Sequence, residues 1–252
     1  MIEEEKTLPF QELSEIYSKD FYRVKSLSRA DHLLSILSLE NVTSNRAIDL
    51  GCGNGIASNR IASGMNTTIL GVDISTNMLE HAQKIGDENP ALSFVNMDIT
   101  HLNFEEDSFD FAFSIFDVLN YLGEEQLDQF LVNMRKILTD NAFIALDFLT
   151  PLTFYDTDYN PDSIHEEDEF YYISKAHILG PNSVGLDLIA FIKDRNDLYR
   201  KIKERHLLHL FEEKHVVQAL QKASFRTISS YDGEELKKTD KHSWHVILIA
   251  QK

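Results

Sequence analysis

Three glycines follow a short apolar run that ends near an acid. The run 47–50 contains Asp49 and leads into Gly51, Gly53 and Gly55. Glycine permits a positive φ in a tight turn, and it lets a ligand approach the backbone with no Cβ in the way. An apolar strand that turns through glycines into a helix is typical of a nucleotide-binding loop. The spacing therefore predicts a nucleotide ligand at this turn.

The loop differs from two common phosphate-binding loops. Ile56 stands where a G-x-G-x-x-G dinucleotide fingerprint has its third glycine, and no lysine follows the glycines as it would in a P-loop. Asp49 would repel a phosphate, but it can accept backbone N–H groups of the turn or a cationic amine of the ligand. We therefore expect a nucleotide that is held without a phosphate cradle.

Two further acids follow apolar runs farther along the chain. Asp73 lies 22 residues after Gly51 (73 − 51), and a carboxylate there can accept both hydroxyls of a ribose. Asp98 can accept a hydrogen bond from the exocyclic amine of an adenine, with Met97 and Ile99 against the ring. Together these acids predict a site for an adenine nucleoside.

Strand and helix patterns alternate around these residues. Nearly continuous apolar strands separated by helical patterns indicate a doubly wound, mainly parallel sheet, and ligands bind at the carboxyl ends of such strands. The chain would begin with an N-terminal arm over residues 1–25 and a helix over 26–40. We expect strands at 46–50, 67–72, 92–96, 110–115 and 142–149, and helices at 55–63 and 123–138.

The alternation stops after Pro151. Residues 151–169 carry seven acids and no Lys or Arg, which predicts a solvated loop. Long β-like runs then follow, separated by turn residues, at 170–179, 184–194 and 198–211. We predict that residues 151–211 form an inserted three-stranded antiparallel meander that acts as a cap.

The last two strands are expected at 225–231 and 245–250, after a helix at 212–223. The polar linker between them is too short for a crossover helix, so they should pair antiparallel. The predicted fold is an α/β fold with a seven-stranded sheet whose last strand is antiparallel, within a single domain over residues 1–252.

Composition narrows the class of partner. The net charge is −17, which repels phosphate backbones and anionic lipid and so disfavours nucleic-acid and membrane partners. Cys52 is the only cysteine, and residues 1–6 do not form a signal peptide, so we expect a cytoplasmic protein. No apolar run approaches the roughly 20 residues that cross a bilayer.

Four motifs together resemble one known family. They are the run 49–55 (Asp-Leu-Gly-Cys-Gly-Asn-Gly), the acid Asp73 that closes the second strand, the sequence 97–100 (Met-Asp-Ile-Thr) and the run 109–116. This set, spread over residues 26–149, resembles the class I S-adenosylmethionine-dependent methyltransferases. The run 116–122, with the insertion after the fifth strand, is similar to a bacterial subgroup of small-molecule methyltransferases that includes sugar N-methyltransferases.

The resemblance implies S-adenosyl-L-methionine as the cofactor. Gly51 and Gly53 would give clearance to its methionine part, Asp73 would hold the ribose, and Asp98 with Ile99 would hold the adenine. The cofactor-binding residues implied in this way are Tyr22, Asp49, Gly51, Cys52, Gly53, Gly55, Asp73, Ile74, Met78, Met97, Asp98, Ile99, Ser114, Ile115 and Phe116.

No base follows from the sequence, because a base is needed only if the acceptor is protonated. The candidates are Tyr121, His165, His206 and His209, and each histidine could equally be an ordinary core or surface residue. His206 and His209 are three residues apart, so in a strand they point to opposite faces and do not form a metal pair. We predict no metal site.

We therefore expect methyl transfer to nitrogen or oxygen of a small-molecule acceptor. The inserted meander would cover the acceptor site or form a homodimer contact. The first alternative is an RNA- or protein-modifying methyltransferase that uses basic residues between 193 and 205. A second is a regulator that binds S-adenosylmethionine without catalysis, and a third is a nicotinamide-dependent oxidoreductase, which Ile56 and Asp98 disfavour.

Overall fold

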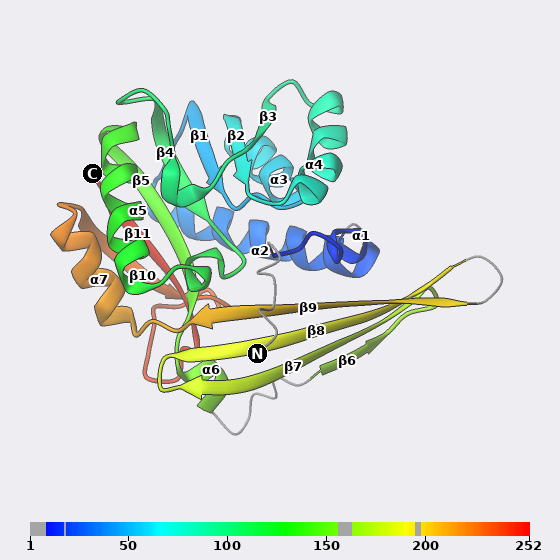
Figure 1. Cartoon of the computed structure of the whole chain (residues 1–252). Helices are drawn as coiled ribbons and strands as arrows, with labels where there is room; N and C mark the ends of the chain where they lie inside the picture. Colours follow the sequence, from blue (N-terminus) through cyan, green and yellow to red (C-terminus); the bar gives the residue numbers. More distant parts are fainter. Residues whose placement is uncertain (1–8, 18, 156–162, 195–197) are drawn as a thin grey trace.

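Seven strands form a central, mostly parallel sheet in the computed structural model, which describes residues 9–17, 19–155, 163–194 and 198–252 (Figure 1). The strand order is β10-β11-β5-β4-β1-β2-β3. The strands are β1 (Arg46–Leu50), β2 (Thr68–Asp73), β3 (Leu92–Asn96), β4 (Phe109–Ser114), β5 (Leu138–Leu149), β10 (Arg226–Asp232) and β11 (His245–Gln251).

The strand order reverses between β1 and β4. β1 pairs in parallel with both β2 and β4, so the chain runs outward from this point in two directions. β11 pairs antiparallel with both β5 and β10. The predicted seven-stranded sheet with an antiparallel last strand is confirmed, and the reversal marks the place where open α/β sheets bind ligands.

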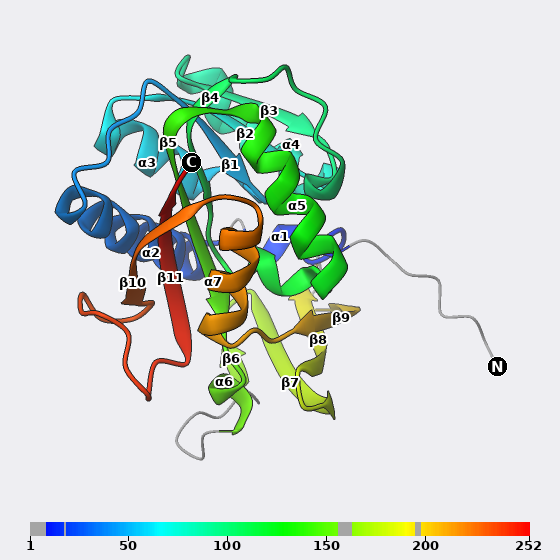
Figure 2. The ribbon, with the colours of Figure 1, turned by 90° about the vertical axis from the view of Figure 1, so that its left-hand side faces the viewer.

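Helices cover both faces of this sheet (Figure 2). Phe130 and Met134 of one helix and Val216 of another pack on one face, while Leu33 and Ile61 pack on the other. The helices of the first face are α5 (Glu124–Ile137) and α7 (Glu213–Lys222), and those of the second are α2 (Asp20–Leu39), α3 (Ile56–Met65) and α4 (Thr76–Glu88). Burial on both faces explains why the parallel strands are nearly continuous apolar runs.

Side chains fix two of the turns that follow the strands. The Ser75 hydroxyl accepts the Met78 N–H at 3.2 Å and so caps α4. Asp98 accepts the Thr100 N–H at 2.8 Å and begins the short helix η1 (Ile99–His101). These caps hold the carboxyl ends of β2 and β3 beside the glycine loop.

The inserted segment forms four strands and not three. The additional strand β6 (Ser163–Glu166) pairs antiparallel with the next strand, with Ser163 opposite Ser174. It was missed because it is short, mostly exposed and part of an acidic segment with no apolar alternation. The other strands are β7 (Phe170–Gly180), β8 (Ser183–Lys193) and β9 (Tyr199–His209), in the order β6-β7-β8-β9.

The second sheet packs against the N-terminal segment and the central sheet. Leu13 and Ile16, in and beside α1 (Ser14–Tyr17), are buried against residues of this sheet such as Leu188. Leu208 of β9 packs against Leu149 at the end of β5. Figure 1 shows the long strands β7, β8 and β9 running along one edge of the central sheet. The insertion therefore lies at the edge where the parallel strands end.

Several boundaries differ from the predicted ones. α2 begins at Asp20, six residues before the predicted helix (26 − 20) and within the predicted N-terminal arm. β5 begins at Leu138, four residues before the predicted strand (142 − 138), because Leu138 pairs with Phe109 ahead of an irregularity in the ladder. The short helix α6 (Leu152–Tyr155) follows β5 where a loop was expected. In the described part of the chain, no helix is long and apolar enough to span a membrane.

Candidate active site

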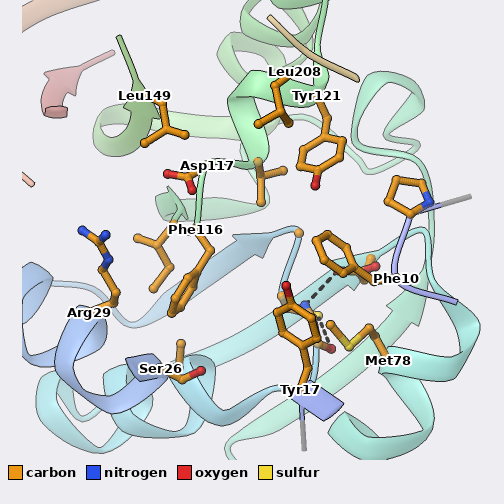
Figure 3. Close-up of a pocket in the computed structure, with 18 of the residues that line it drawn as sticks. Phe10, Tyr17, Ser26, Arg29, Met78, Phe116, Asp117, Tyr121, Leu149 and Leu208 are labelled. Atoms are coloured by element: carbon orange, nitrogen blue, oxygen red, sulfur yellow. Dashed lines mark hydrogen bonds between the residues drawn. The ribbon is translucent and has the colours of Figure 1, made fainter. Parts of the chain in front are cut away.

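A cavity of about 800 Å³ opens at the carboxyl ends of β1, β2 and β4, where the strand order reverses. Figure 3 shows Phe10, Tyr17 and Met78 on one side of it, and Arg29 and Asp117 on the other. The first side is formed by the glycine loop, the ends of β2 and β3 and the N-terminal segment. The second side is formed by α2, the segment after β4 and the inserted sheet.

The three glycines all have a positive φ, of 78° at Gly51, 53° at Gly53 and 77° at Gly55. They differ in what an added Cβ would meet. A Cβ at Gly51 would lie 2.5 Å from Val118, and one at Gly55 would lie 2.8 Å from Phe94. A Cβ at Gly53 would have only the Met78 methyl within reach, at 3.8 Å.

Only Gly53 therefore fits the predicted role of giving clearance to a ligand. Gly51 lines the cavity, but its missing Cβ makes room for Val118, so the prediction for Gly51 needs this correction. Gly55 does not line the cavity. It lies just before α3 in the left-handed conformation, and its missing Cβ lets β3 and α4 pack closely.

Asp73 faces the loop from the end of β2. Its Oδ2 accepts the Gly53 N–H and its Oδ1 accepts the Ser75 N–H, both at 2.8 Å. Burial raises the pKa of this carboxyl, and the backbone donors act in the opposite direction. Each oxygen keeps a further lone pair, so the carboxylate is held in one orientation with acceptor capacity toward the cavity.

Asp98 and Ile99 line the cavity at the end of β3, and Ile74 and Met78 line it beside Asp73. Burial tends to raise the pKa of Asp98, but the N–H and hydroxyl of Thr100 lower it, so the group stays ionised. Met97 does not line the cavity. It packs against the hydrophobic core, which corrects its predicted contact with a ligand ring.

Asp49 and Cys52 line the floor of the cavity. Asp49 is almost fully buried and accepts the Ser58 hydroxyl at 2.6 Å. Burial raises its pKa to about 7, with Ser58 lowering it and Asp73 raising it further. Burial also raises the pKa of the Cys52 thiol, so it stays neutral. A cationic ligand group near Asp49 would favour its ionised form.

The predicted residues at the end of β4 do not all face the cavity. Ile115 and Phe116 line the cavity, whereas Ser114 is buried and donates its hydroxyl to the Leu50 carbonyl at 3.0 Å. Ser114 therefore joins β4 to β1 and does not face a ligand, which corrects its predicted role. Phe116 has a φ of 68°, an uncommon conformation for an aromatic residue.

The N-terminal segment closes one side of the cavity. Tyr17 lines it and accepts a hydrogen bond at its carbonyl from Asn54 of the glycine loop, at 2.6 Å. Tyr22, the predicted aromatic of the arm, also lines the cavity and stacks on Tyr17 with ring centroids 4.2 Å apart. Phe10 lies edge-on to Tyr17. Residues 1–8 and 18 of the predicted arm fall outside the described residues.

Tyr121 lines the cavity, but the candidate histidines do not. The Tyr121 hydroxyl lies 2.7 Å from His206 Nδ1, and His206 Nε2 lies 2.8 Å from Glu204. His206 is buried and His209, half-buried, follows on the opposite face of β9. His165 lies on β6, where it pairs with Glu167 at 2.8 Å.

Five charged residues meet on the other side of the cavity, and the sequence analysis did not single out any of them. They come from α2, β5, β11 and the segments after β4 and β10. Ligand atoms of Asp117, Asp147 and His245 lie within 4.8 Å of one another, a spacing that a metal ion could also use. Arg29 and Glu234 join them through a 2.7 Å ion pair. No spacing rule could have found this group, because its members lie far apart in the sequence.

Residues 47–141 match the family model described as a methyltransferase domain. The chain carries a methyltransferase domain. The matched range includes the glycine loop, Asp73, Asp98 and Asp117, so it covers the first side of the cavity without its N-terminal segment, and part of the other side. The expected resemblance to the class I S-adenosylmethionine-dependent methyltransferases is confirmed over this range by the match, and the fold agrees with it.

A curated relative matches part of the chain. It is the 2-phytyl-1,4-naphtoquinone methyltransferase of Nostoc punctiforme, 32% identical over 113 residues, which are 42% of this chain and 48% of that protein. The chain thus spans about half the length of the curated relatives it matches. The inserted sheet lies outside the range matched by the methyltransferase-domain family model.

Solved structures share the whole architecture. An S-adenosylmethionine-dependent methyltransferase from Clostridium acetobutylicum has a TM-score of 0.81 at 19% identity, covering 96% of this chain and 98% of that one. An amino pentose methyltransferase from Micromonospora echinaspora, solved with SAM bound, has a TM-score of 0.66 at 16% identity, covering 97% and 98%. At these identities the likeness shows the fold, and this fold includes both the methyltransferase domain and the insertion.

Proposed function

We propose that the chain is an S-adenosylmethionine-dependent methyltransferase that methylates nitrogen or oxygen of a small-molecule acceptor. The observation that carries this proposal is that one cavity is lined by the glycine loop, Asp73 and Asp98 on its first side and by the inserted sheet on its second side. The names of the relatives and neighbours, a quinone methyltransferase and an amino pentose methyltransferase, support a small acceptor.

The described residues fit the cofactor. Asp73 offers two oriented acceptors to a ribose, Asp98 offers an acceptor to an adenine amine, and the open space at Gly53 admits a chain against the backbone. Asp49 supplies a buried carboxylate for an ammonium group. The proposed cofactor-binding residues are Tyr17, Tyr22, Asp49, Gly51, Cys52, Gly53, Asp73, Ile74, Met78, Asp98, Ile99, Ile115 and Phe116.

When bound, S-adenosylmethionine supplies a methyl group that is already activated on a sulfonium. The chain's own residues then have two tasks, which are to align the acceptor and to exclude water. Phe10 and Tyr17 close the cavity from the N-terminal segment, and Leu208 closes it from the inserted sheet. We therefore assign the inserted sheet the role of a cap over the acceptor, while a dimer contact through it stays a prediction.

Tyr121 is the proposed catalytic residue among the original candidates. Burial and nearby tyrosines and carboxylates raise its pKa, so its hydroxyl stays protonated and works as a hydrogen-bond partner and not as an anionic base. His206 lies between this hydroxyl, at Nδ1, and the Glu204 carboxylate, at Nε2. His206 is thus a positioning residue, and His165 and His209 have no assigned role.

The macromolecular alternative has less support. Three of the basic residues that would contact RNA or protein are engaged within the chain: Arg200 pairs with Glu15 at 2.6 Å, and Lys203 and Arg205 both pair with Asp187. These pairs remove much of the local positive charge that a phosphate backbone requires.

A thermal-shift experiment tests the proposed function. S-adenosylmethionine and S-adenosylhomocysteine should raise the melting temperature at concentrations well above their dissociation constants, and NAD should not. A chain that responds to neither sulfur ligand does not bind the cofactor. A chain that binds it, but methylates nothing in a broad panel of metabolites, would favour the non-catalytic regulator.

A further inference from the structure

The charged group at the acceptor side of the cavity is organised by Asp147, at the end of β5. Its carboxylate accepts the Asp117 N–H at 2.7 Å and the Phe116 N–H at 3.2 Å. Both of these residues have a positive φ, of 60° and 68°. His245 Nε2 contributes a third hydrogen bond to Asp147 at 3.0 Å. Asp147 therefore holds the backbone in a conformation that it would rarely adopt alone.

This conformation directs the Asp117 side chain toward the cavity (Figure 3). The side chain is 32% exposed, but its Oδ1 is shielded from solvent and accepts no hydrogen bond from any described residue. His245 Nε2 lies 3.7 Å from Oδ1, so Oδ2 is the oxygen that a ligand in the cavity can reach. A largely shielded carboxylate without a donor is costly, so a ligand that donates to its accessible oxygen would be favoured.

Charged groups of both signs surround Asp117. His245 has a carboxylate at each ring nitrogen, Asp147 at Nε2 and Glu234 at Nδ1, which favours the doubly protonated ring. Burial lowers the pKa of His245, but Asp147 and Glu234 raise it to about 9. Arg29 adds a second cation. Lys25 lines the same cavity as a third cation; burial and Arg29 lower its pKa and Glu234 raises it. Three carboxylates thus face three cations, and what sets Asp117 apart is that its Oδ1 accepts no hydrogen bond from any described residue.

A metal ion does not suit this group. A metal would need a lone pair on His245 Nε2, which carries a proton shared with Asp147. The Arg29 guanidinium, which lies against the same imidazole, would also repel a divalent cation. An organic ammonium needs no lone pair from the protein and brings its own donors, so it fits the free acceptor on Asp117.

We propose that Asp117 binds the ammonium group of an amine-bearing acceptor and takes one proton from it, which makes nitrogen the methylated atom. This proposal rests on the proposed function. The ammonium R–NH₃⁺ and the carboxylate become R–NH₂ and the carboxylic acid of Asp117. The amine lone pair then forms the nitrogen–carbon bond as the carbon–sulfur bond breaks, and that electron pair stays on sulfur. Asp117 later releases its proton to solvent.

The surroundings of Asp117 suit this role. Burial and Asp147 raise its pKa, and His245 and Arg29 lower it, giving about 6, so the carboxylate is ionised at neutral pH and still basic enough to accept a proton. Glu234, behind Arg29, adds a small upward effect. Leu149, Phe154, Tyr172, Leu186, Leu208 and Trp244 line the rest of this chamber. The acceptor should therefore carry its amine on an apolar or ring-shaped body.

Trp244 provides a direct readout, because it lines the cavity and is the only tryptophan in the sequence. The protein, saturated with S-adenosylhomocysteine, is titrated with benzylammonium and with the uncharged isostere benzyl alcohol while tryptophan fluorescence is followed. We expect the ammonium to bind at least about tenfold more tightly than the alcohol, as a charge-assisted hydrogen bond would provide. Asp117→Asn should abolish this preference.

The controls separate this inference from the proposed function. Asn tolerates the left-handed conformation of residue 117, so the variant should fold and still respond to S-adenosylhomocysteine. Asp140→Asn removes an aspartate that is 93% exposed and should keep the ammonium preference. A wild type that does not prefer or does not bind benzylammonium, or an Asp117→Asn variant that keeps the preference, contradicts the inference. Failure to bind S-adenosylhomocysteine contradicts the proposed function instead.

Discussion

The two sides of the cavity are built in different ways. On the cofactor side, the functional residues lie next to the strand ends that position them: Gly53 follows β1, Asp73 ends β2 and Asp98 follows β3. On the acceptor side, Asp117 depends on residues from other parts of the chain, such as His245, which is 128 residues away (245 − 117). The first side is positioned by residues next to the strand ends, whereas the second side forms only when β5, β11 and α2 pack together.

This difference explains why a family model matches the first side and not the whole of the second. Loop geometry at a strand end is determined by a few neighbouring residues, so it can be retained while the remainder of the chain changes. The acceptor side uses the inserted sheet and the C-terminal strands, which lie outside residues 47–141. Relatives with different acceptors can therefore share the cofactor side alone.

The largest expected effect concerns the acceptor side and its dependence on pH. The folded pKa of His245, about 9, lies above its usual value of 6.5, so the stabilisation is complete below pH 6.5 and is lost as the pH rises through 9. The free energy of unfolding should fall by up to roughly 3 kcal/mol between pH 6.5 and 9.5. Urea denaturation at several pH values measures this, and His245→Gln should remove most of the slope. An unchanged slope in that variant would show that His245 is not the titrating group.

Removal of the ribose acceptor should have the largest effect on the cofactor side. Asp73→Ala should weaken S-adenosylhomocysteine binding by about a hundredfold, because two oriented carboxylate acceptors are lost. Isothermal titration calorimetry measures the dissociation constant, with Asp140→Asn as the matched control. Binding within a few-fold of the wild type would mean that the ribose lies elsewhere.

Two glycine variants separate packing from ligand clearance within the loop. Gly55→Ala should lower the free energy of unfolding by about 2 kcal/mol, because its Cβ would contact Phe94 and Ala82. Gly53→Ala carries a similar backbone cost but meets no close neighbour, so it should impair S-adenosylhomocysteine binding more than stability. Denaturation and calorimetry on both proteins test the pair. If both variants lose the same affinity for S-adenosylhomocysteine and the same free energy of unfolding, the two glycines do not have different roles.

The smallest effect is expected for the hydrogen bonds that attach the N-terminal segment to the inserted sheet. Glu204 of β9 accepts the backbone N–H groups of Phe10, Glu12 and Leu13, at 2.7 to 3.0 Å. Glu204→Gln should weaken this attachment by about 1 kcal/mol and accelerate amide exchange over residues 10–13 several-fold. Hydrogen exchange measured by mass spectrometry tests it, with Glu212→Gln, at the exposed residue that precedes α7, as the control. Unchanged protection would indicate that the apolar contacts of Leu13 and Ile16 hold the segment alone.

Much of the fold could be predicted because its signals are local. The apolar strands, their closing acids and the glycine turn predicted the sheet, its antiparallel last strand and the place of the site. Gly55, Met97 and Ser114 were assigned to the cofactor because sequence position alone does not tell whether a side chain faces the cavity or the core. β6 was missed because an exposed edge strand carries no apolar alternation.

The acceptor side could not have been predicted in the same way. Asp147 reads as one acid within an apolar strand, and only the fold shows that it holds the backbone of Phe116 and Asp117. His245 begins β11, and its two carboxylate partners come from different segments. Long-range hydrogen bonds of this kind leave no periodicity, and the orphaned Oδ1 of Asp117 becomes visible only when all its neighbours are placed.

A crystal structure of the protein with S-adenosylhomocysteine and benzylammonium tests the division of the cavity most directly. We predict that the ribose hydroxyls lie within hydrogen-bonding distance of Asp73 and that the adenine lies beside Asp98 and Ile99. The ammonium should lie within hydrogen-bonding distance of the accessible oxygen of the Asp117 carboxylate, in the same cavity. A nucleoside bound away from Asp73, or an ammonium bound away from Asp117, would contradict the account.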